Sequence, residues 1–317
     1  MKRIIFIFFT LCLLQSCLTE SLNGELIFTK AMPSGGFNYP YFLYIPEGAS
    51  VEKELVLIVE PNNTGSVTDD FNQHIEKAKR TASLDFYIGN FVARELKLPL
   101  LVPVFPRSKS DWEIYTHALD RDALLQKDNP LERIDLQVLA MVDDAKTKLA
   151  DSGYTIRDKV FMTGFSASGT FTNRFTLIHP GKIQASAAGG LNGLLMLPVG
   201  ELNGEKLNYP IGTGNFMSLL NKPFDSAAFM NTPQFYFMGA LDDNDAIPYE
   251  DGYSENERKV IYKLLGQEMM PSRWENCKRI YELENINTSI KTYPEIGHEN
   301  PDIVKKEIVE FLKQNID

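Results

Sequence analysis

The 317-residue chain has few cysteines, few histidines and fewer basic than acidic residues. It contains 3 Cys and 4 His, and its 32 Lys and Arg residues face 42 Asp and Glu residues, for a net charge of −10. This charge argues against nucleic acid, or an anionic membrane surface, as the main partner. Beyond its N-terminal segment the sequence has no apolar stretch long enough to cross a bilayer, and it has no internal repeat or low-complexity tract.

The N-terminal segment predicts export. A basic start precedes an apolar run over Ile4–Leu14 that is too short to span a bilayer and is typical of a signal peptide. The run ends in Leu-Gln-Ser-Cys at residues 14–17, which resembles the lipobox of bacterial lipoproteins. The resemblance implies a signal peptide over 1–16, lipidation of Cys17, a polar tether over 17–24 and a membrane anchor in the cell envelope. An ordinary secretory signal with an incidental cysteine is the alternative.

Lipidation of Cys17 would leave Cys277 as the last cysteine of the mature chain, because Cys12 lies in the removed segment. An exported chain with a single free cysteine cannot depend on an intramolecular disulfide. Cys277 lies in the sequence WENCKRIYELENI, which predicts an amphipathic helix. We therefore expect it to be a buried packing residue rather than a nucleophile.

Strands and helices alternate along the rest of the chain. Short apolar runs predict strands over Pro40–Pro46, Leu55–Val59, Leu100–Phe105, Val160–Thr163, Ile183–Ala187, Gln234–Met238 and Ser289–Tyr293. The alternation predicts one α/β domain over 25–317, with a mostly parallel central sheet and helices on both faces. Residues 191–232 interrupt it, because they are rich in Gly, Pro and Asn and lack periodicity. We expect an irregular, lid-like insertion there.

The stretch KVFMTGFSASG, Lys159–Gly169, is the most informative segment for function. It predicts a buried strand that ends in a sharp turn, with Gly164 and Ser168 two residues on either side of Ser166. Small residues at these positions let a strained turn present a nucleophilic hydroxyl between a strand and a helix. Ser166 is therefore the candidate nucleophile.

A serine hydroxyl needs a base within hydrogen-bond reach and an acid that orients the base. His298 lies between the last predicted strand and a C-terminal helix, and it is the best-placed histidine for the base. The sequence PQFYFMGALDDNDAIP places Asp242 and Asp245 after a predicted strand; Asp242 is the first choice for the acid and Asp245 the second. The acidic loop lacks the glycine and terminal glutamate of an EF-hand, so we expect no metal and no cofactor.

The order Ser166, Asp242, His298 around these strands resembles the α/β-hydrolase superfamily, near feruloyl-esterase, polyhydroxyalkanoate-depolymerase and dienelactone-hydrolase-like enzymes. The resemblance covers residues 38–317, and Ser168 departs from it where glycine is usual. It implies an α/β-hydrolase fold and a Ser-His-Asp triad. It also implies an oxyanion site made by the N–H of Ala167 and an N–H from the loop after Val59. In that loop Glu60-Pro61 replaces the common His-Gly, which makes Asn62 the expected donor and Asn63 the reserve.

These expectations define three candidate functions. The first is a serine hydrolase that cleaves carboxylic esters through an acyl-enzyme, with carbohydrate or phenolic-acid esters as candidate substrates. The loop with Trp112 and Tyr115 would suit such groups if its aromatic side chains are exposed; packing beneath the insertion is the alternative. The second candidate is a peptidase of the same fold. The third is a surface-tethered binding module without turnover.

Overall fold

The computed structural model describes residues 23–63 and 67–316. The predicted signal peptide and Cys17 lie outside the described residues. Strand β1 (Gly24–Thr29) begins at the last residue of the tether predicted for 17–24. In the described part of the chain, no helix is both long and apolar enough to cross a membrane.

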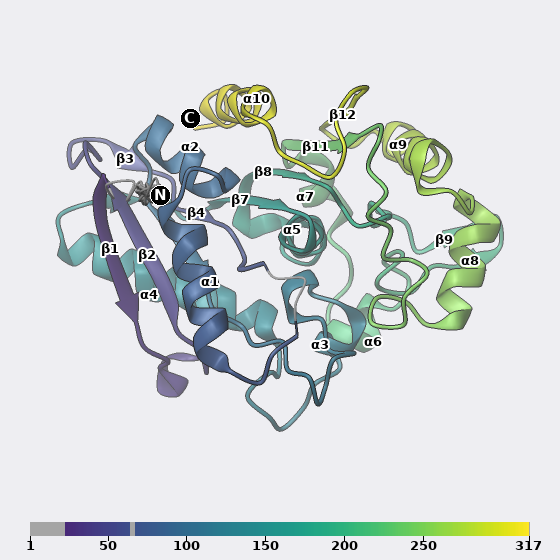
Figure 1. Cartoon of the computed structure of the whole chain (residues 1–317), viewed down its shortest axis with the longest axis horizontal. Coiled ribbons are helices and arrows are strands. Elements are labelled where there is room, and N and C mark those ends of the chain that lie inside the picture. Colours follow the sequence, from purple (N-terminus) through teal and green to yellow (C-terminus); the bar gives the residue numbers. More distant parts are fainter. Residues whose placement is uncertain (1–22, 64–66, 317) are drawn as a thin grey trace, which may run out of the picture.

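An eight-stranded sheet forms the centre of the molecule (Figure 1). Its spatial order is β1, β2 (Tyr41–Pro46), β5 (Leu100–Pro103), β4 (Ile58–Val59), β7 (Val160–Phe165), β8 (Ile183–Gly189), β11 (Gln234–Gly239) and β12 (Thr288–Tyr293). Strand β2 pairs antiparallel with both β1 and β5, and every pair from β5 to β12 is parallel. The mostly parallel sheet predicted from the sequence is confirmed.

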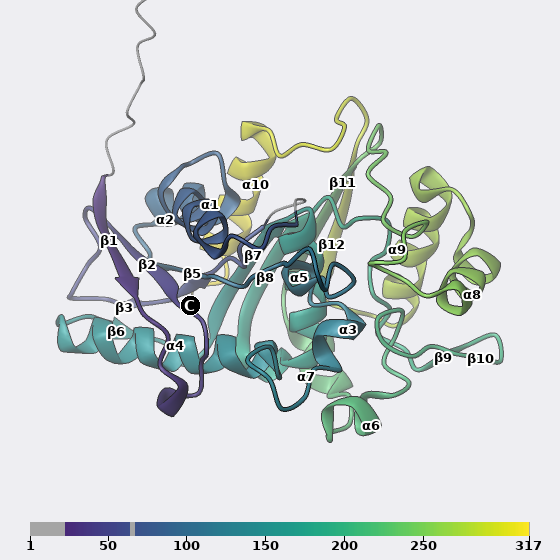
Figure 2. The same cartoon turned by 60° about the horizontal axis from the view of Figure 1, so that its bottom comes forward.

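Helices cover both faces of the sheet (Figure 2). One face packs against α1 (Phe71–Ser83), α2 (Ile88–Leu96) and α10 (Asp302–Lys313), and the other against α4 (Ile134–Asp151), α5 (Ala167–Ile178) and α9 (Trp274–Leu283). Side chains alternate between the two faces along each strand. In β5, Leu100 and Val102 join the α1–α2–α10 side, whereas Leu101 joins the other. The predicted two-sided helical cover is confirmed.

The strand predicted over Leu55–Val59 is divided in two. Strand β3 (Glu54–Leu55) pairs with β6 (Thr155–Ile156) in a separate two-stranded sheet, and β4 alone enters the central sheet. All five residues from Leu55 to Val59 are buried, so their apolar run does not reveal where the chain leaves one sheet for the other. The short β4 then delivers Glu60 and the following loop to the carboxyl edge of the sheet.

The irregular insertion at 191–232 carries little regular structure. It contains the hairpin of β9 (Glu201–Leu202) and β10 (Glu205–Lys206), followed by the short helices α6 (Phe216–Leu220) and α7 (Ser226–Asn231). Its buried apolar side chains belong to the same core as α4, α5 and α9. Two hydrogen bonds fix the backbone of Met196. Its N–H donates to Asn173 Oδ1 at 3.0 Å, and its carbonyl accepts from Tyr281 Oη at 2.7 Å. The start of the insertion is thus anchored to α5 and α9.

Candidate active site

Ser166 occupies a strained turn between β7 and α5. Its φ of 61° and ψ of −128° place it in a region that residues other than glycine rarely adopt. The turn is tight, because a methyl group at Gly164 would overlap the carbonyl of Ser168. Ser166 N–H donates to the Gly189 carbonyl at 2.9 Å, which ties the turn to β8. The close approach of Gly164 to Ser168 and the hydrogen bond to β8 therefore hold the strained turn in place.

Ser168, which stands where glycine is usual, uses its hydroxyl to hold the turn. Its Oγ donates to the Phe165 carbonyl at 2.8 Å and accepts from the Phe165 N–H at 3.0 Å. Asn63 Nδ2 also donates to the Phe165 carbonyl, at 2.8 Å. Two side chains, through three hydrogen bonds, thus hold Phe165, the residue that precedes Ser166.

His298 and Asp242 form a hydrogen-bonded pair beside this turn. His298 Nδ1 lies 2.9 Å from Asp242 Oδ2, and the second oxygen of Asp242 accepts the Asn244 N–H at 2.9 Å. The imidazole lies 4.7 Å, centroid to centroid, from the ring of Phe165, the residue before Ser166. Asp245 points elsewhere: its two oxygens pair with the Arg273 guanidinium at 2.8 and 3.1 Å. The structure brings Asp242 to His298, and Asp245 stabilises the following loop.

Two amide side chains link the serine hydroxyl to the imidazole. Ser166 Oγ donates to Asn192 Oδ1 at 3.3 Å, and Asn244 Nδ2 donates to the same oxygen at 3.1 Å. Asn244 Nδ2 also lies 3.2 Å from His298 Nε2. Since an amide N–H can only donate, Nε2 is the acceptor and Nδ1 carries the proton toward Asp242. Among the described hydrogen bonds none joins Ser166 directly to His298.

The expected oxyanion donors lie at the same edge of the sheet. Ala167 is the first residue of α5, so its N–H has no acceptor within the helix. The side chain of Asn62 is buried and holds Phe105, donating to its carbonyl and accepting its N–H, both at 3.1 Å. Asn63, the reserve, is the residue whose side chain reaches the turn that carries Ser166. Residues 64–66 of this loop lie outside the described part of the chain.

Glu60, which replaces the usual histidine, is buried beneath this loop. Its Oε2 accepts the N–H of Gly89 in the first turn of α2, and Thr163 Oγ1 on β7 donates to it at 3.3 Å. Burial raises the pKa of the Glu60 carboxyl to about 7, although both hydrogen bonds oppose the shift. Glu60 thus connects the start of the loop after β4 to α2 and β7.

A narrow hollow borders Asn192, the residue whose Oδ1 accepts the Ser166 hydroxyl. Its volume is about 10 Å³, which is room for one water molecule. It is lined by Tyr115, Ala118, Asp120, Thr170, Arg174, Asn192, Ala246, Gly252 and Tyr253. Arg174 is buried and donates to the Ala118 carbonyl and to Tyr253 Oη, both at 2.9 Å. Burial raises the pKa of the Asp120 carboxyl to about 7.

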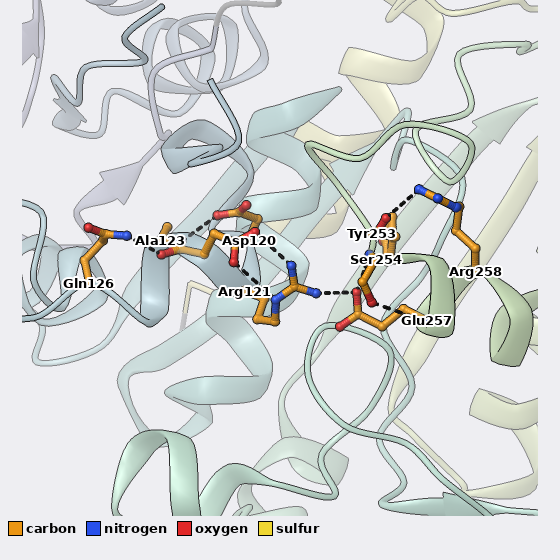
Figure 3. A network of polar contacts seen from close by, with 9 residues as sticks. Asp120, Arg121, Ala123, Gln126, Tyr253, Ser254, Glu257 and Arg258 are labelled. Carbon is orange, nitrogen blue, oxygen red and sulfur yellow. Dashed lines mark hydrogen bonds and ion pairs between the residues drawn. The ribbon is translucent and has the colours of Figure 1, made fainter. Parts of the chain in front are cut away.

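An ion-pair network joins the two loops that wall this hollow (Figure 3). One loop continues into α3 (Arg121–Leu124) and the other into α8 (Glu255–Leu265). Arg121 contacts Glu257 Oε2 at 2.5 Å and Asp122 Oδ2 at 2.9 Å, and Glu257 also accepts the Ser254 N–H at 2.7 Å. Tyr115 lines the hollow beneath the Arg107 guanidinium, 3.5 Å from its ring. Trp112 lies apart from it, 41% exposed in an outer groove with Asp111 and Glu113.

The other three histidines and Cys277 are buried inside the protein. His74, His117 and His179 are all buried, and His179 Nε2 lies 2.8 Å from Asp135. Cys277 is buried as expected, and burial raises the pKa of its thiol to about 12, which disfavours a thiolate. Within the described residues no three His, Cys, Asp or Glu side chains gather into a set that could hold a metal ion.

Comparison with solved structures gives the fold family. The chain is similar to poly(aspartic acid) hydrolase-1 from Sphingomonas sp. KT-1, with a TM-score of 0.57, 15% sequence identity and alignment of 92% of this chain and 97% of that one. It is also similar to an S-formylglutathione hydrolase from Agrobacterium tumefaciens, with a TM-score of 0.51, 12% identity and alignment of 93% and 95%. The chain has the α/β-hydrolase fold. No family model matches the sequence, and no curated protein sequence matches it.

Within this α/β-hydrolase fold, several site residues escape sequence reasoning. Asn192 and Asn244 come from irregular loops, and nothing in their local sequence indicates that they meet. Thr170 and Arg174, which line the hollow, do carry a signal, because they lie four residues apart on α5 and so share a face of the helix.

Proposed function

We propose that the chain is a serine hydrolase that cleaves carboxylic esters with Ser166 as nucleophile, His298 as base and Asp242 as orienting acid. One observation carries the proposal: the 2.9 Å His298–Asp242 pair stands beside a serine in a strained strand–turn–helix. A buried carboxylate on Nδ1 holds the imidazole in the tautomer that leaves Nε2 free to accept a proton. The fold supports the proposal, since it is the α/β-hydrolase fold.

The reaction requires the amide bridge to open. Asn244 leaves His298 Nε2, and Ser166 Oγ then transfers its proton to Nε2 as the oxygen forms a bond to the acyl carbon. The imidazolium returns the proton to the alcohol oxygen as the ester C–O bond breaks. Water repeats the sequence on the acyl-enzyme and releases the acid.

The developing oxyanion would be stabilised at the N-terminus of α5. The Ala167 N–H and the positive end of the helix dipole are oriented toward negative charge on the acyl oxygen. A backbone N–H of Asn62 or Asn63 is the expected second donor. The hydrogen bond from Asn63 to the Phe165 carbonyl supports Asn63, because it holds that loop against the nucleophile turn.

Esters of carbohydrates or phenolic acids remain the candidate substrates, with Tyr115 beside the hollow and the exposed Trp112 as aromatic contacts. One structural neighbour is a poly(aspartic acid) hydrolase, and poly(aspartic acid) is joined by amide bonds. Amide cleavage by a peptidase of the same fold is therefore the second candidate. Parallel assays with short acyl esters and aminoacyl amides separate the two.

A fluorophosphonate probe tests the nucleophile directly. Its phosphorus forms a bond to an activated serine oxygen and expels fluoride, and mass spectrometry of the labelled peptide locates the adduct. We expect labelling of the wild type and none of Ser166→Ala. Ser218→Ala, which removes an exposed serine hydroxyl on α6, is the control and should still react. Folded wild-type protein that resists the probe would favour the non-catalytic binding module.

We also propose that Cys17 carries a lipid that anchors the chain to a membrane of the cell envelope, as the Leu-Gln-Ser-Cys sequence at 14–17 suggests. Metabolic labelling with a fatty acid should mark the wild type and spare Cys17→Ser. Equal labelling of both proteins would refute lipidation at this residue.

A further inference from the structure

A second pairing of a histidine with a carboxylate lies at the far end of helix α5. His179 directly follows the last residue of the helix, and its Nε2 lies 2.8 Å from Asp135 Oδ2 on α4. Both side chains are buried. Ser166 precedes the same helix, and the 12 residues of α5 span about 18 Å along its axis. This pair is therefore separate from the candidate active site.

The partners of His179 determine which of its nitrogens is basic. Burial lowers the pKa of His179, although its hydrogen bond to Asp135 opposes the shift, and this favours the neutral imidazole. A carboxylate can only accept a hydrogen bond, so Nε2 carries the proton and Nδ1 is an acceptor. Lys222 Nζ lies 3.2 Å from Nδ1. Arg133 donates to both oxygens of Asp135, at 2.9 and 2.7 Å, and keeps the carboxylate in place.

The amine of Lys222 has only neutral hydrogen-bond partners. Its Nζ donates to the Ile178 carbonyl at 2.6 Å and to His179 Nδ1. No ion pair among the described residues includes Lys222, and a carboxylate partner would have favoured the charged ammonium. Burial lowers the pKa of this amine, although the charge of Asp135 opposes the shift. A neutral amine can make both hydrogen bonds with its two N–H groups and keep its lone pair for an electrophile.

Lys222 and His179 both line a surface pocket. Its volume is about 610 Å³, which is enough for a small organic molecule. An aromatic ring and two prolines contribute apolar walls, from Phe224, Pro180 and Pro223. The exposed Lys182 and Asp225 also line it and carry opposite charges. The lining therefore favours an uncharged ligand with an apolar or aromatic group.

We propose that Lys222 is a nucleophilic amine that binds a small apolar aldehyde in this pocket as an imine, with His179 as its base. The nitrogen forms a bond to the aldehyde carbon. Its two protons pass in turn through His179 Nδ1 to the carbonyl oxygen, which leaves as water as the C=N bond forms. Asp135 stabilises the charge that the imidazole gains with each proton. Water reverses the reaction and releases the aldehyde. This site goes beyond the proposed ester hydrolysis and does not require it.

Reductive trapping with benzaldehyde tests the amine. Sodium cyanoborohydride reduces each imine to a stable benzylamine, and mass spectrometry of the peptides gives the initial rate at each lysine. We expect Lys222 to react at least about tenfold faster than Lys206, an exposed lysine on β10, because a positioned base typically contributes about 10² or more in rate. Lys182 controls for concentration of the aldehyde in the pocket, since no described hydrogen bond joins its amine to His179.

Three variants assign the role of each group. His179→Gln removes the base, while the glutamine amide can still donate to Asp135, and the rate at Lys222 should fall to that at Lys206. Lys222→Arg should abolish the fast labelling and keep a donor for the Ile178 carbonyl. Ser166→Ala should be labelled like the wild type, because the two sites are separate. A failure of the proposed hydrolase therefore leaves this result unaffected.

The rates at three lysines decide the proposal. Labelling of Lys222 no faster than that of Lys206 would overturn it, and so would equal labelling of Lys182, which would reflect concentration of the aldehyde alone. Fast labelling that persists in His179→Gln would also overturn it, because His179 would then not be the base. If His179→Gln does not fold, the comparison of the three lysines in the wild type decides.

Discussion

Replacing Glu60 with glutamine should make the protein progressively more stable than the wild type as the pH rises. The carboxyl is buried, and its pKa is raised from 4.5 to about 7 in the folded state. Between these values the folded protein holds a proton that the unfolded chain has lost, so the wild type loses stability with increasing pH. The stabilisation is fully present below about pH 4.5 and is lost as the pH passes about 7.

The shift sets the size of the effect. A change from 4.5 to about 7 corresponds to roughly 3 kcal/mol, since one pKa unit is 1.36 kcal/mol. Glutamine does not ionise and can still accept the Gly89 N–H through its amide oxygen. The free energy of unfolding of Glu60→Gln minus that of the wild type should therefore increase by about 2 kcal/mol between pH 5 and pH 8.

Urea unfolding of both proteins at pH 5, 6, 7 and 8 measures this difference. Asp120 has a pKa raised in the same direction, but it is present in both proteins and cancels in the comparison. Asp120→Asn should show a gain of the same sign against the wild type. A Glu60→Gln difference that stays constant with pH, or falls as pH rises, would refute the argument that Glu60 is buried as a neutral acid.

Three further predictions concern the proposed catalytic groups. Asp242→Asn should lower kcat about 10⁴-fold with little change in folding, because the imidazole loses its orienting carboxylate; steady-state kinetics with a short acyl ester checks it, and a loss below tenfold would contradict the role. Asn244→Ala should react severalfold faster with a fluorophosphonate, since the amide that occupies His298 Nε2 is gone; slower labelling would show that Asn244 holds the imidazole in place. Gly239→Ala places a methyl group against the Ile296 carbonyl and should displace the His298 loop. It should reduce kcat at least about tenfold at an unchanged KM, and unaltered kinetics would disprove this coupling.

The central strands could be predicted because their signal is local. Strands β7, β8 and β11 are buried along nearly their whole length, and each reads as a short apolar run bounded by turn residues. Strand β1 was not predicted, since it lies at the sheet edge with much of its surface in solvent and offers a weaker pattern. Local signal thus specifies the parallel centre of the sheet better than its antiparallel edge.

The sequence predicts the order of the candidate site residues but not their contacts. The turn chemistry around Ser166 and the chain positions of Asp242 and His298 follow from motif and spacing. The choice between Asp242 and Asp245 requires knowledge of Arg273, which engages Asp245 from 28 residues later. The contact of Asn244 with Asn192 joins residues 52 positions apart in two irregular loops. Such contacts depend on tertiary packing, and no hydrophobic periodicity or local motif in the sequence indicates them.

The order of strands in the sheet nearly repeats their order in the chain, with β4 and β5 as the exchanged pair. From β7 onward, each new strand of this sheet therefore leaves the ribosome after its neighbour in the sheet, and this part of the sheet can grow toward β12 without reopening. His298 follows the last strand to join, so the proposed nucleophile, Ser166, lacks its proposed base until synthesis is almost finished. Under the proposed function, the growing chain carries Ser166 in an inert state, and the final strand completes both the sheet and the proposed chemistry.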